Sequence, residues 1–166
     1  MTDLVTADAG IRQLYARYAD AVWRKDPQAF GDCLTEDAEW RIAGAVMKGR
    51  AAAVAQIGQV LQQFRWCSIN FKQPIIHIKD GKVTGRAFFM EQSVFATGRT
   101  MFAMGTYYDH YVNCGDQWRF SWRLFQNHYA GSPDLSSPLF ETPDYGPPPA
   151  MPSLDAPTFR HTDVIN

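Results

Sequence analysis

The sequence has little charge and no excess of one sign. Only 20% of its 166 residues are Asp, Glu, Lys or Arg, and the formal net charge is -1 with a pI of about 6.4. Phosphate contacts need a basic excess, so we expect no nucleic acid partner. A membrane-spanning helix needs about 18 consecutive apolar residues. No run in the chain approaches this length, so we expect no membrane association.

Cysteine is also scarce. Cys33, Cys67 and Cys114 are widely spaced and form no C-x-x-C pair. We therefore expect neither a disulfide framework nor a thiolate zinc site, and this usage fits a reducing cytoplasm. The segment 1–4 has neither the positive nor the apolar region of a secretory signal, which agrees with a cytoplasmic location.

The common cofactor motifs are missing too. The four histidines form no H-x-x-H or H-E-x-x-H pattern, so the sequence predicts no metal site. It also contains no P-loop, no G-x-S-x-G and no G-x-G-x-x-G after a strand. We therefore expect a protein that works without a cofactor.

Aromatic residues, in contrast, are abundant. They make up 14% of the chain, as 5 Trp, 7 Tyr and 11 Phe, and hydrophobic residues reach 46%. This composition supports a full core in a single domain. It also suits a pocket for an apolar ligand that contains rings.

Proline divides the chain at about residue 130. Eight of the ten prolines follow this point, and they exclude a helix or a central strand there. We predict a folded domain over residues 1–130 and an ordered, Pro-rich arm over 131–166 that covers the pocket mouth or a neighbouring subunit. The candidate anchors of the arm are Phe140, Tyr145, Phe159 and Ile165.

Before that point, the hydrophobic pattern changes from a helical to a strand period. Ile11, Leu14 and Tyr18 share one helical face, and Thr6 is a candidate N-cap. A short helix is predicted after Asp26-Pro27, and a third over about 50–64. Strands are predicted over 38–48, 66–79, 83–97, 99–113 and 117–129, with a hairpin turn at Asp80-Gly81. The order is that of an α+β domain with a curved antiparallel sheet.

Four segments carry a resemblance to a known family. They are Ile11 to Tyr18, Thr35 to Trp40, Gly105 to Asp109 and Gln117 to Phe120. In this order and spacing the chain resembles the SnoaL-like branch of the nuclear transport factor 2-like superfamily. The resemblance implies that three N-terminal helices and the curved sheet form a conical barrel with a central pocket. It also implies a relation to scytalone and bile-acid dehydratases, to a hexachlorocyclohexane dehydrochlorinase and to lignin-dimer lyases that release formaldehyde.

The catalytic pair of the dehydratase-like members is not preserved. The resemblance places Trp23 where they have Asp and Asn70 where they have His. Neither side chain accepts a proton near neutral pH. A shift of the alignment would bring Asp20 or Asp26 into reach instead, although Asp20 lies off the apolar helical face.

Strand alternation offers other candidates for the chemistry. Glu91 shares a face with Phe89 and is the only carboxylate that we expect to point inward, where desolvation would raise its pKa. Its alternatives are a glutamate in water at the sheet edge and a structural ion pair, for which Arg123 is the candidate partner. The catalytic candidates are Glu91, Tyr107, Arg123, Tyr18, Lys72 and His128. The candidates for binding substrate are Tyr15, Trp23, Trp40, Asn70, Phe89, Phe125 and Asn127.

These observations predict a cofactor-independent lyase for a bulky aromatic or polycyclic small molecule, such as a lignin-derived phenol. The reaction would be an elimination, or a retro-aldol-type loss of a fragment such as formaldehyde. Three alternatives remain open: a non-catalytic binding or assembly module, an isomerase, and the small subunit of a ring-hydroxylating dioxygenase. An apolar outer sheet face with Phe88, Met104, Tyr108 and Trp122 predicts a homo-oligomer, a dimer or a trimer.

Overall fold

Three helices and seven strands make up the described part of the chain. The computed structural model describes residues 3–115 and 117–142. The helices are α1 (Leu4–Trp23), α2 (Pro27–Gly31) and α3 (Arg50–Gln62). The strands are β1 (Leu34–Ile42), β2 (Ala45–Lys48), β3 (Phe64–Phe71), β4 (Ile75–Lys79), β5 (Lys82–Phe95), β6 (Thr100–Asn113) and β7 (Trp118–Gly131). This is the expected α+β order with a curved sheet.

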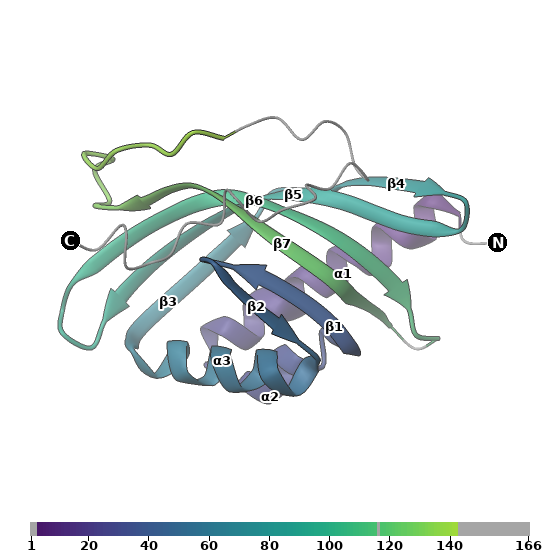
Figure 1. Cartoon of the computed structure of the whole chain (residues 1–166), viewed down its shortest axis with the longest axis horizontal. Helices are drawn as coiled ribbons and strands as arrows, with labels where there is room; N and C mark the ends of the chain where they lie inside the picture. Colours follow the sequence, from purple (N-terminus) through teal and green to yellow (C-terminus); the bar gives the residue numbers. More distant parts are fainter. Residues whose placement is uncertain (1–2, 116, 143–166) are drawn as a thin grey trace.

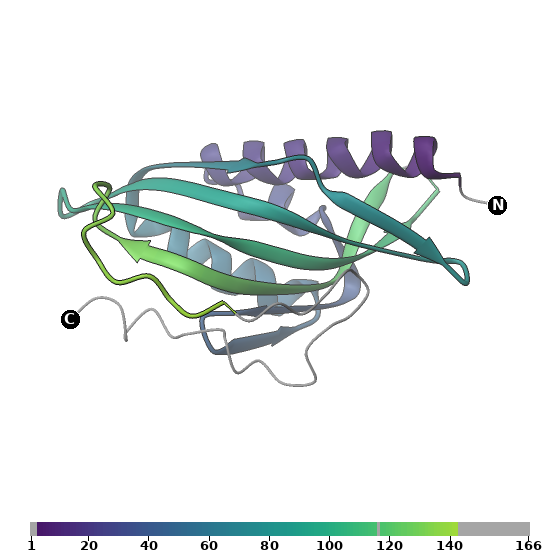
Figure 2. The same cartoon turned by 90° about the horizontal axis from the view of Figure 1, so that it is seen from above.

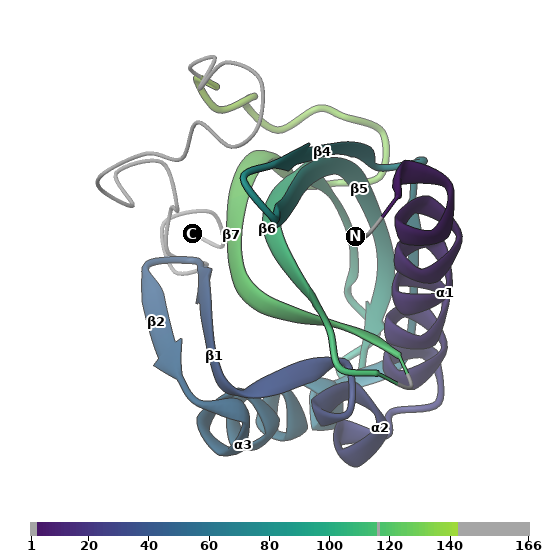
Figure 3. The same ribbon diagram turned by 90° about the vertical axis from the view of Figure 1, so that its right-hand side faces the viewer.

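One twisted sheet organises the molecule (Figure 1). Its strand order is β2-β1-β7-β6-β5-β3, and β4 pairs with β5 beside this path. All pairs are antiparallel except β1 with β7. Figure 3 shows the long strands curling around the core, with α1 along one side and α2 and α3 below. The inner face of the sheet therefore points at the helices.

The first helix begins earlier than the sequence predicts. Asp3, not Thr6, is the N-cap of α1: its carboxylate accepts from the Thr6 amide at 3.0 Å and from the Thr6 hydroxyl at 2.7 Å. The apolar face is the predicted one, with Ile11 and Leu14 fully buried. Asp26 caps α2 with Pro27 at its start, also as predicted. None of the helices in the described residues has the length and apolar character of a membrane span.

Two of the predicted strands are each divided in two. The segment 38–48 folds back on itself at Ala43-Gly44, where both residues have positive φ, so β1 and β2 form a hairpin. The segment 66–79 breaks before Pro74, which has no amide to donate to a ladder. The chain then restarts as β4 and pairs with β5 across the predicted Asp80-Gly81 turn, where φ is 51° and 75°.

After β7 the chain turns back along the outer face of the sheet. The Tyr129 hydroxyl donates to the Ser132 carbonyl at 2.6 Å, and the Phe140 amide donates to the His128 carbonyl at 3.0 Å. Phe140 packs against a small cluster of buried residues that includes Met101. Figure 2 shows this segment and α1 on opposite faces of the sheet. The other predicted anchors, Tyr145, Phe159 and Ile165, lie outside the described residues.

The outer sheet face is less exposed than predicted. Phe88, Met104 and Trp122 are half-buried, and Tyr108 is only 3% exposed. The Trp122 ring packs against His110, and its indole N–H donates to Glu39 at 3.2 Å. Part of this face is thus already covered within the chain itself.

Candidate active site

The inner face of the sheet brings polar and aromatic side chains into register. Strands β5, β6 and β7 alternate, so every second residue points at the helices. Three consecutive rows across these strands are Gly85, Asp109 and Arg123; Ala87, Tyr107 and Phe125; and Phe89, Gly105 and Asn127. The Phe125 ring covers Gly105 so closely that a Cβ there would lie 2.5 Å from it, which only glycine avoids. The rows place charged, phenolic and amide groups on one surface.

A buried ion pair lies in the first row. Arg123 donates to both oxygens of Asp109, from Nε to Oδ1 at 2.6 Å and from Nη2 to Oδ2 at 3.2 Å. The Tyr15 hydroxyl of α1 donates to Asp109 Oδ2 at 2.5 Å and lies 2.8 Å from the Tyr111 hydroxyl. Asp109 and Arg123 are 0% and 1% exposed, so removal of either charge would leave the other unpaired in the core.

The Arg123 guanidinium is held between aromatic rings. Its carbon lies 3.7 Å from the centroid of Phe120, 3.9 Å from Tyr107 and 4.6 Å from Tyr18. Burial alone would lower the pKa of Arg123, but Asp109 and the two tyrosines outweigh it and raise that pKa above its ordinary value. The guanidinium therefore stays charged. Its Nη1 is buried and has no hydrogen-bond partner in the described structure.

Tyr18 and Tyr107 bring two hydroxyls together beside this cation. Burial raises the pKa of Tyr18 to about 12, although Arg123 and the Tyr107 hydroxyl oppose the rise. Burial also raises the pKa of Tyr107 well above its ordinary value. Both side chains therefore remain protonated near neutral pH and act as hydrogen-bond donors.

Glu91 is the second inward carboxylate, and no cation of the described residues forms an ion pair with it. Its Oε1 is buried without a partner, while the residue as a whole keeps some exposure. Burial raises the pKa of Glu91 to about 7, although the neighbouring Ser93 side chain opposes this rise. The Ser93 hydroxyl is itself without a hydrogen-bond partner in the described residues. A carboxyl group with this pKa exchanges its proton at neutral pH.

Further polar atoms on the inner side lack partners as well. The indole N–H of Trp40, on β1, and Oδ1 of Asn127, on β7, are buried and unpaired in the described part of the molecule. Such atoms are rare in folded proteins and mark places where water or a ligand completes the hydrogen bonding. Here they accompany Glu91 and Arg123 on the same side of the sheet.

Aromatic rings line the inner side between these polar groups. Phe89 lies 5.4 Å from Phe71, 5.5 Å from Tyr107 and 5.3 Å from Phe125, measured between centroids. Tyr15 lies 4.6 Å from Phe71. The inner side is thus an aromatic lining with a few polar groups, which suits an apolar ring-containing ligand.

Two of the expected binding residues point away from this lining. Trp23 is 58% exposed at the end of α1, because Val22 takes the inward direction and one residue turns a helix by about 100°. Asn70 is exposed on β3, where Ile69 points inward, because successive side chains of a strand face opposite sides. Asp20 is exposed and pairs with Arg24 at 2.8 Å, so it is not an inward carboxylate either.

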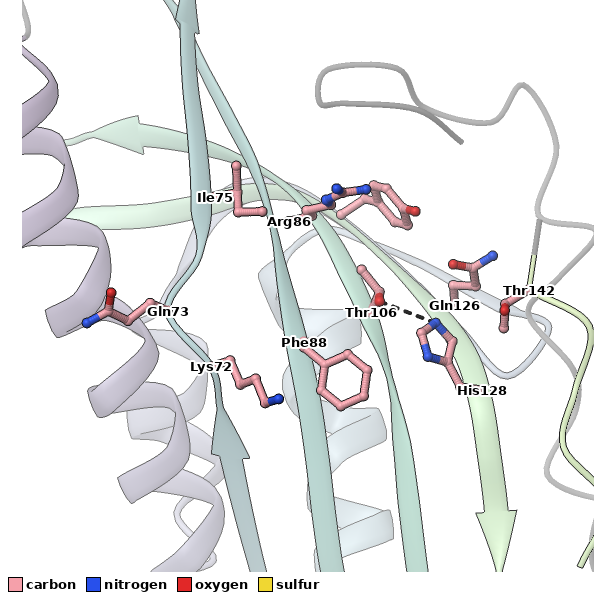
Figure 4. A pocket seen from close by; sticks show the side chains of 10 residues that line it. Lys72, Gln73, Ile75, Arg86, Phe88, Thr106, Gln126, His128 and Thr142 are labelled. Atoms are coloured by element: carbon pink, nitrogen blue, oxygen red, sulfur yellow. Dashed lines mark hydrogen bonds between the residues drawn. The ribbon is translucent and has the colours of Figure 1, made fainter. Parts of the chain in front are cut away.

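Two of the catalytic candidates, Lys72 and His128, lie on the outer face, where alternation from Asn127 also places His128. Lys72 follows Asn70 in alternation, and its Nζ lies 5.3 Å from the Phe88 centroid. His128 is the extra residue where the pairing of β6 and β7 shifts, since Gly105 pairs with Asn127 and Met104 with Tyr129. Figure 4 shows both side chains in a cleft of about 430 Å³ on this outer face.

The structure also adds residues that the sequence analysis left out. Asp109, not Glu91, is the partner of Arg123, and Glu91 is therefore not the only inward carboxylate. Tyr111 and Ser93 join the inner side as well. The signal for Asp109 was present, because it shares a strand face with Tyr107. Among the described residues, no group of three His, Cys, Asp or Glu side chains lies close enough to hold a metal ion.

A model of the SnoaL-like domain family matches residues 3–123. The chain belongs to this family. This SnoaL-like domain has the arrangement of helices and curved sheet described above. No curated protein sequence matches the chain in addition.

Solved structures share the fold of this SnoaL-like domain at low sequence identity. A scytalone dehydratase-like protein from Novosphingobium aromaticivorans is 18% identical with a TM-score of 0.72, over 76% of this chain and 87% of that one. A hexachlorocyclohexane dehydrochlorinase from Novosphingobium barchaimii is 18% identical with a TM-score of 0.69, over 84% and 97%. A nuclear transport factor 2-like protein from Salmonella enterica is 15% identical with a TM-score of 0.68, over 75% and 93%. At these identities the likeness concerns the fold.

Proposed function

We propose that this SnoaL-like domain is a lyase that eliminates water from a bulky aromatic or polycyclic substrate bound against the inner face of the sheet. One observation carries the proposal. Glu91 is a carboxyl group with a buried, unpartnered Oε1 and a pKa raised to about 7, on the same side as the aromatic lining. It is suited to take up and release a proton at neutral pH.

In the proposed step, the Glu91 carboxylate removes a proton from a carbon of the substrate. The electrons of that C–H bond form a double bond, and the C–O bond to the neighbouring carbon breaks. The departing oxygen takes the proton back from Glu91, so the products are an alkene and water and the carboxylate is regenerated. One residue serves both transfers, as its pKa allows.

The groups near Arg123 would hold the substrate rather than transfer protons. Tyr18 and Tyr107 stay protonated and can donate to an oxygen on the substrate ring, and the free Nη1 of Arg123 can do the same. These donors would stabilise negative charge that develops on a phenol or ketone oxygen during proton removal. Asn127 would orient the substrate through its unpaired Oδ1.

The lining indicates the class of substrate. Phe71, Phe89, Phe125 and the tyrosine rings offer faces and edges for another ring system. A phenol conjugated to the reacting carbon would act as the electron sink that a cofactor otherwise supplies. Lignin-derived phenolic compounds with a hydroxyl beside an acidic C–H have this character. The names of two proteins with the same fold, a dehydratase-like protein and a dehydrochlorinase, also describe eliminations.

A substrate panel with matched variants tests the proposal. We expect alkene formation from a phenolic β-hydroxy ketone, followed by ultraviolet absorbance and mass spectrometry. Glu91→Gln should lower turnover by about 10²-fold or more, the scale for losing general acid–base catalysis. Glu36→Gln, which changes an exposed carboxylate on β1, is the control and should retain turnover. Release of formaldehyde instead of water, or full activity in Glu91→Gln, would contradict the proposal.

A second variant separates binding from chemistry. Tyr107→Phe removes one hydroxyl and keeps the ring that contacts Phe125 at 4.8 Å. We expect it to lower kcat by about 10-fold or more with little change in KM, because the lost donor acts on charge that develops in the transition state. An effect on KM alone would assign Tyr107 to the binding wall.

A further inference from the structure

The outer face of the sheet carries a cleft that the proposed lyase reaction does not use. It has a volume of about 430 Å³ and lies on the side of the sheet opposite α1 (Figure 4). Its described lining comes from the link between β3 and β4, from the start of β4, from the middle of β5 to β7, and from the segment after β7. The lining residues are Lys72, Gln73, Ile75, Arg86, Phe88, Thr106, Tyr108, Gln126, His128 and Thr142.

The charge of the cleft has one sign. Lys72 and Arg86 are basic, and no Asp or Glu is among the described lining residues. Neither Lys72 nor Arg86 forms an ion pair with a described residue. Glu141 precedes Thr142 in the chain but is exposed and does not line the cleft. In a chain with a net charge of -1, these two cations form a local positive site.

The two cations flank an aromatic ring. Arg86 and Phe88 are two residues apart on β5 and so share the outer face. The Lys72 amide donates to the Phe88 carbonyl at 2.9 Å, which places Lys72 on the other side of the same residue. Lys72 Nζ lies 5.3 Å from the Phe88 centroid. A ligand that contacts the Phe88 ring would therefore have a cation within reach on either side.

Neutral polar groups complete the lining. The His128 ring packs edge-on against Phe88 at 5.6 Å, and its Nε2 lies 3.2 Å from the Thr106 hydroxyl. Partial burial lowers the pKa of His128, so the ring is neutral at neutral pH and adds a hydrogen-bonding group without charge. The lining thus combines one ring surface, two cations and neutral donors or acceptors.

We propose that this cleft is a second binding site, for a small molecule with one aromatic ring and a carboxylate. The ring would pack against Phe88, and the carboxylate would bind Lys72 and Arg86. The site is independent of the interior chemistry, because the sheet separates it from Glu91 and Arg123. Its volume falls in the range of small-molecule sites and exceeds what a single ring with a carboxylate occupies.

Calorimetric titration of the full chain with benzoate and 4-hydroxybenzoate tests this site. We expect saturable binding of both, and affinity at least about tenfold weaker for the neutral amide benzamide, because the ion-paired hydrogen bonds are lost. The double variant Lys72→Gln/Arg86→Gln should lower benzoate affinity by about tenfold or more. Lys79→Gln/Arg99→Gln, which removes two exposed cations that do not line the cleft, should not change it.

Two further measurements locate the binding. Phe88→Leu keeps an apolar side chain and should weaken benzoate without unfolding the protein, which circular dichroism checks. Backbone amide shifts on titration should concentrate at Phe88, Thr106 and His128. The proposal is overturned if benzoate does not saturate, if benzamide binds equally well, or if the affinity changes with Glu91→Gln and not with Lys72→Gln/Arg86→Gln.

Discussion

Glu91 and Asp109 are both inward carboxylates, and their surroundings give them different roles. Asp109 accepts from Arg123 and Tyr15, so its charge is compensated and locked into the fold. Glu91 forms no ion pair within residues 3–115 and 117–142, and burial raises its pKa to about 7. A compensated carboxylate holds structure together, whereas an uncompensated one gains and loses its proton near neutrality.

The raised pKa of Glu91 predicts a pH-dependent stability. The folded protein holds a proton on Glu91 that the unfolded chain loses above a pKa of 4.5. The free energy of unfolding should therefore fall as pH rises from about 4.5 to about 7, by up to roughly 3 kcal/mol from this group. Glu91→Gln has no such proton, so its stability relative to the wild type should rise over the same interval. Urea unfolding of both proteins at about pH 5 and pH 8 measures the difference.

The control for this prediction is Glu36→Gln, which changes an exposed carboxylate. Its stability should keep a constant offset from the wild type across the interval. A constant offset for Glu91→Gln as well would show that the carboxyl of Glu91 is solvated.

Strand alternation predicted which side chains of the sheet point inward. The family resemblance did not predict this correctly for Trp23 and Asn70. Alternation alone placed Glu91 with Phe89, and Arg123 with Phe125 and Asn127. Trp23 and Asn70 were each one residue away from an inward neighbour. In a helix or a strand, an error of one residue is enough to turn a side chain to the other side. His128 lies on the outer face, as alternation from Asn127 indicates, and the bulge in β7 changes only the parity of the residues that follow it.

At the scale of elements, the Asp109–Arg123 pair ties β6 to β7 and, through Tyr15, to α1. Asp109→Asn and Arg123→Met should each lower the free energy of unfolding by about 3–5 kcal/mol, because each leaves one buried group without its partner. The double variant Asp109→Leu/Arg123→Met should be more stable than either single variant, since no charge remains unpaired. Denaturant unfolding tests this. If both single variants lowered the free energy of unfolding by less than about 1 kcal/mol, the ion pair would not be buried away from solvent.

The segment after β7 depends on Phe140 for its position. Phe140 packs against Met101, Ala103 and Ala130, whereas its neighbour Leu139 is 68% exposed. Phe140→Ala should lower the free energy of unfolding by about 1–2 kcal/mol, less than for a fully buried ring. Leu139→Ala should change it by less than about 0.5 kcal/mol. Equal effects of the two substitutions on thermal unfolding would show that this segment is not anchored through Phe140.

The order of elements followed from periodicity, but the breaks within them did not. The positive φ at Ala43-Gly44 and the break before Pro74 turned two predicted strands into four. Glycine and proline often interrupt strands. Gly44 and Pro74 therefore indicated the two breaks, although the predicted strands ran through them. The pairing of β1 parallel to β7 joins distant parts of the chain, and no local pattern encodes it.

At the scale of the whole molecule, we predict self-association through the part of the outer sheet face around Met104 and Trp122, beside the cleft that Phe88 lines. Light scattering should give a mass two or three times the 18.8 kDa of the chain. Met104→Lys places a charge among the half-buried apolar residues of this face and should shift the protein toward monomer. Gln59→Lys, on the exposed side of α3, is the control and should not change the mass. A monomer at micromolar concentration in the unaltered protein would refute the prediction.

The proposed chemistry depends above all on a Glu91 carboxyl that exchanges its proton near neutral pH inside the domain. Carbon-detected NMR of protein labelled at the glutamate side-chain carboxyl measures it directly, with Glu91→Gln assigning the resonance. We predict that the Glu91 carboxyl titrates with a pKa of about 7, while the exposed glutamates titrate near their ordinary values. Titration of Glu91 near 4.5 would contradict the account, because such a carboxyl is solvated and has lost the property on which the proposed chemistry depends.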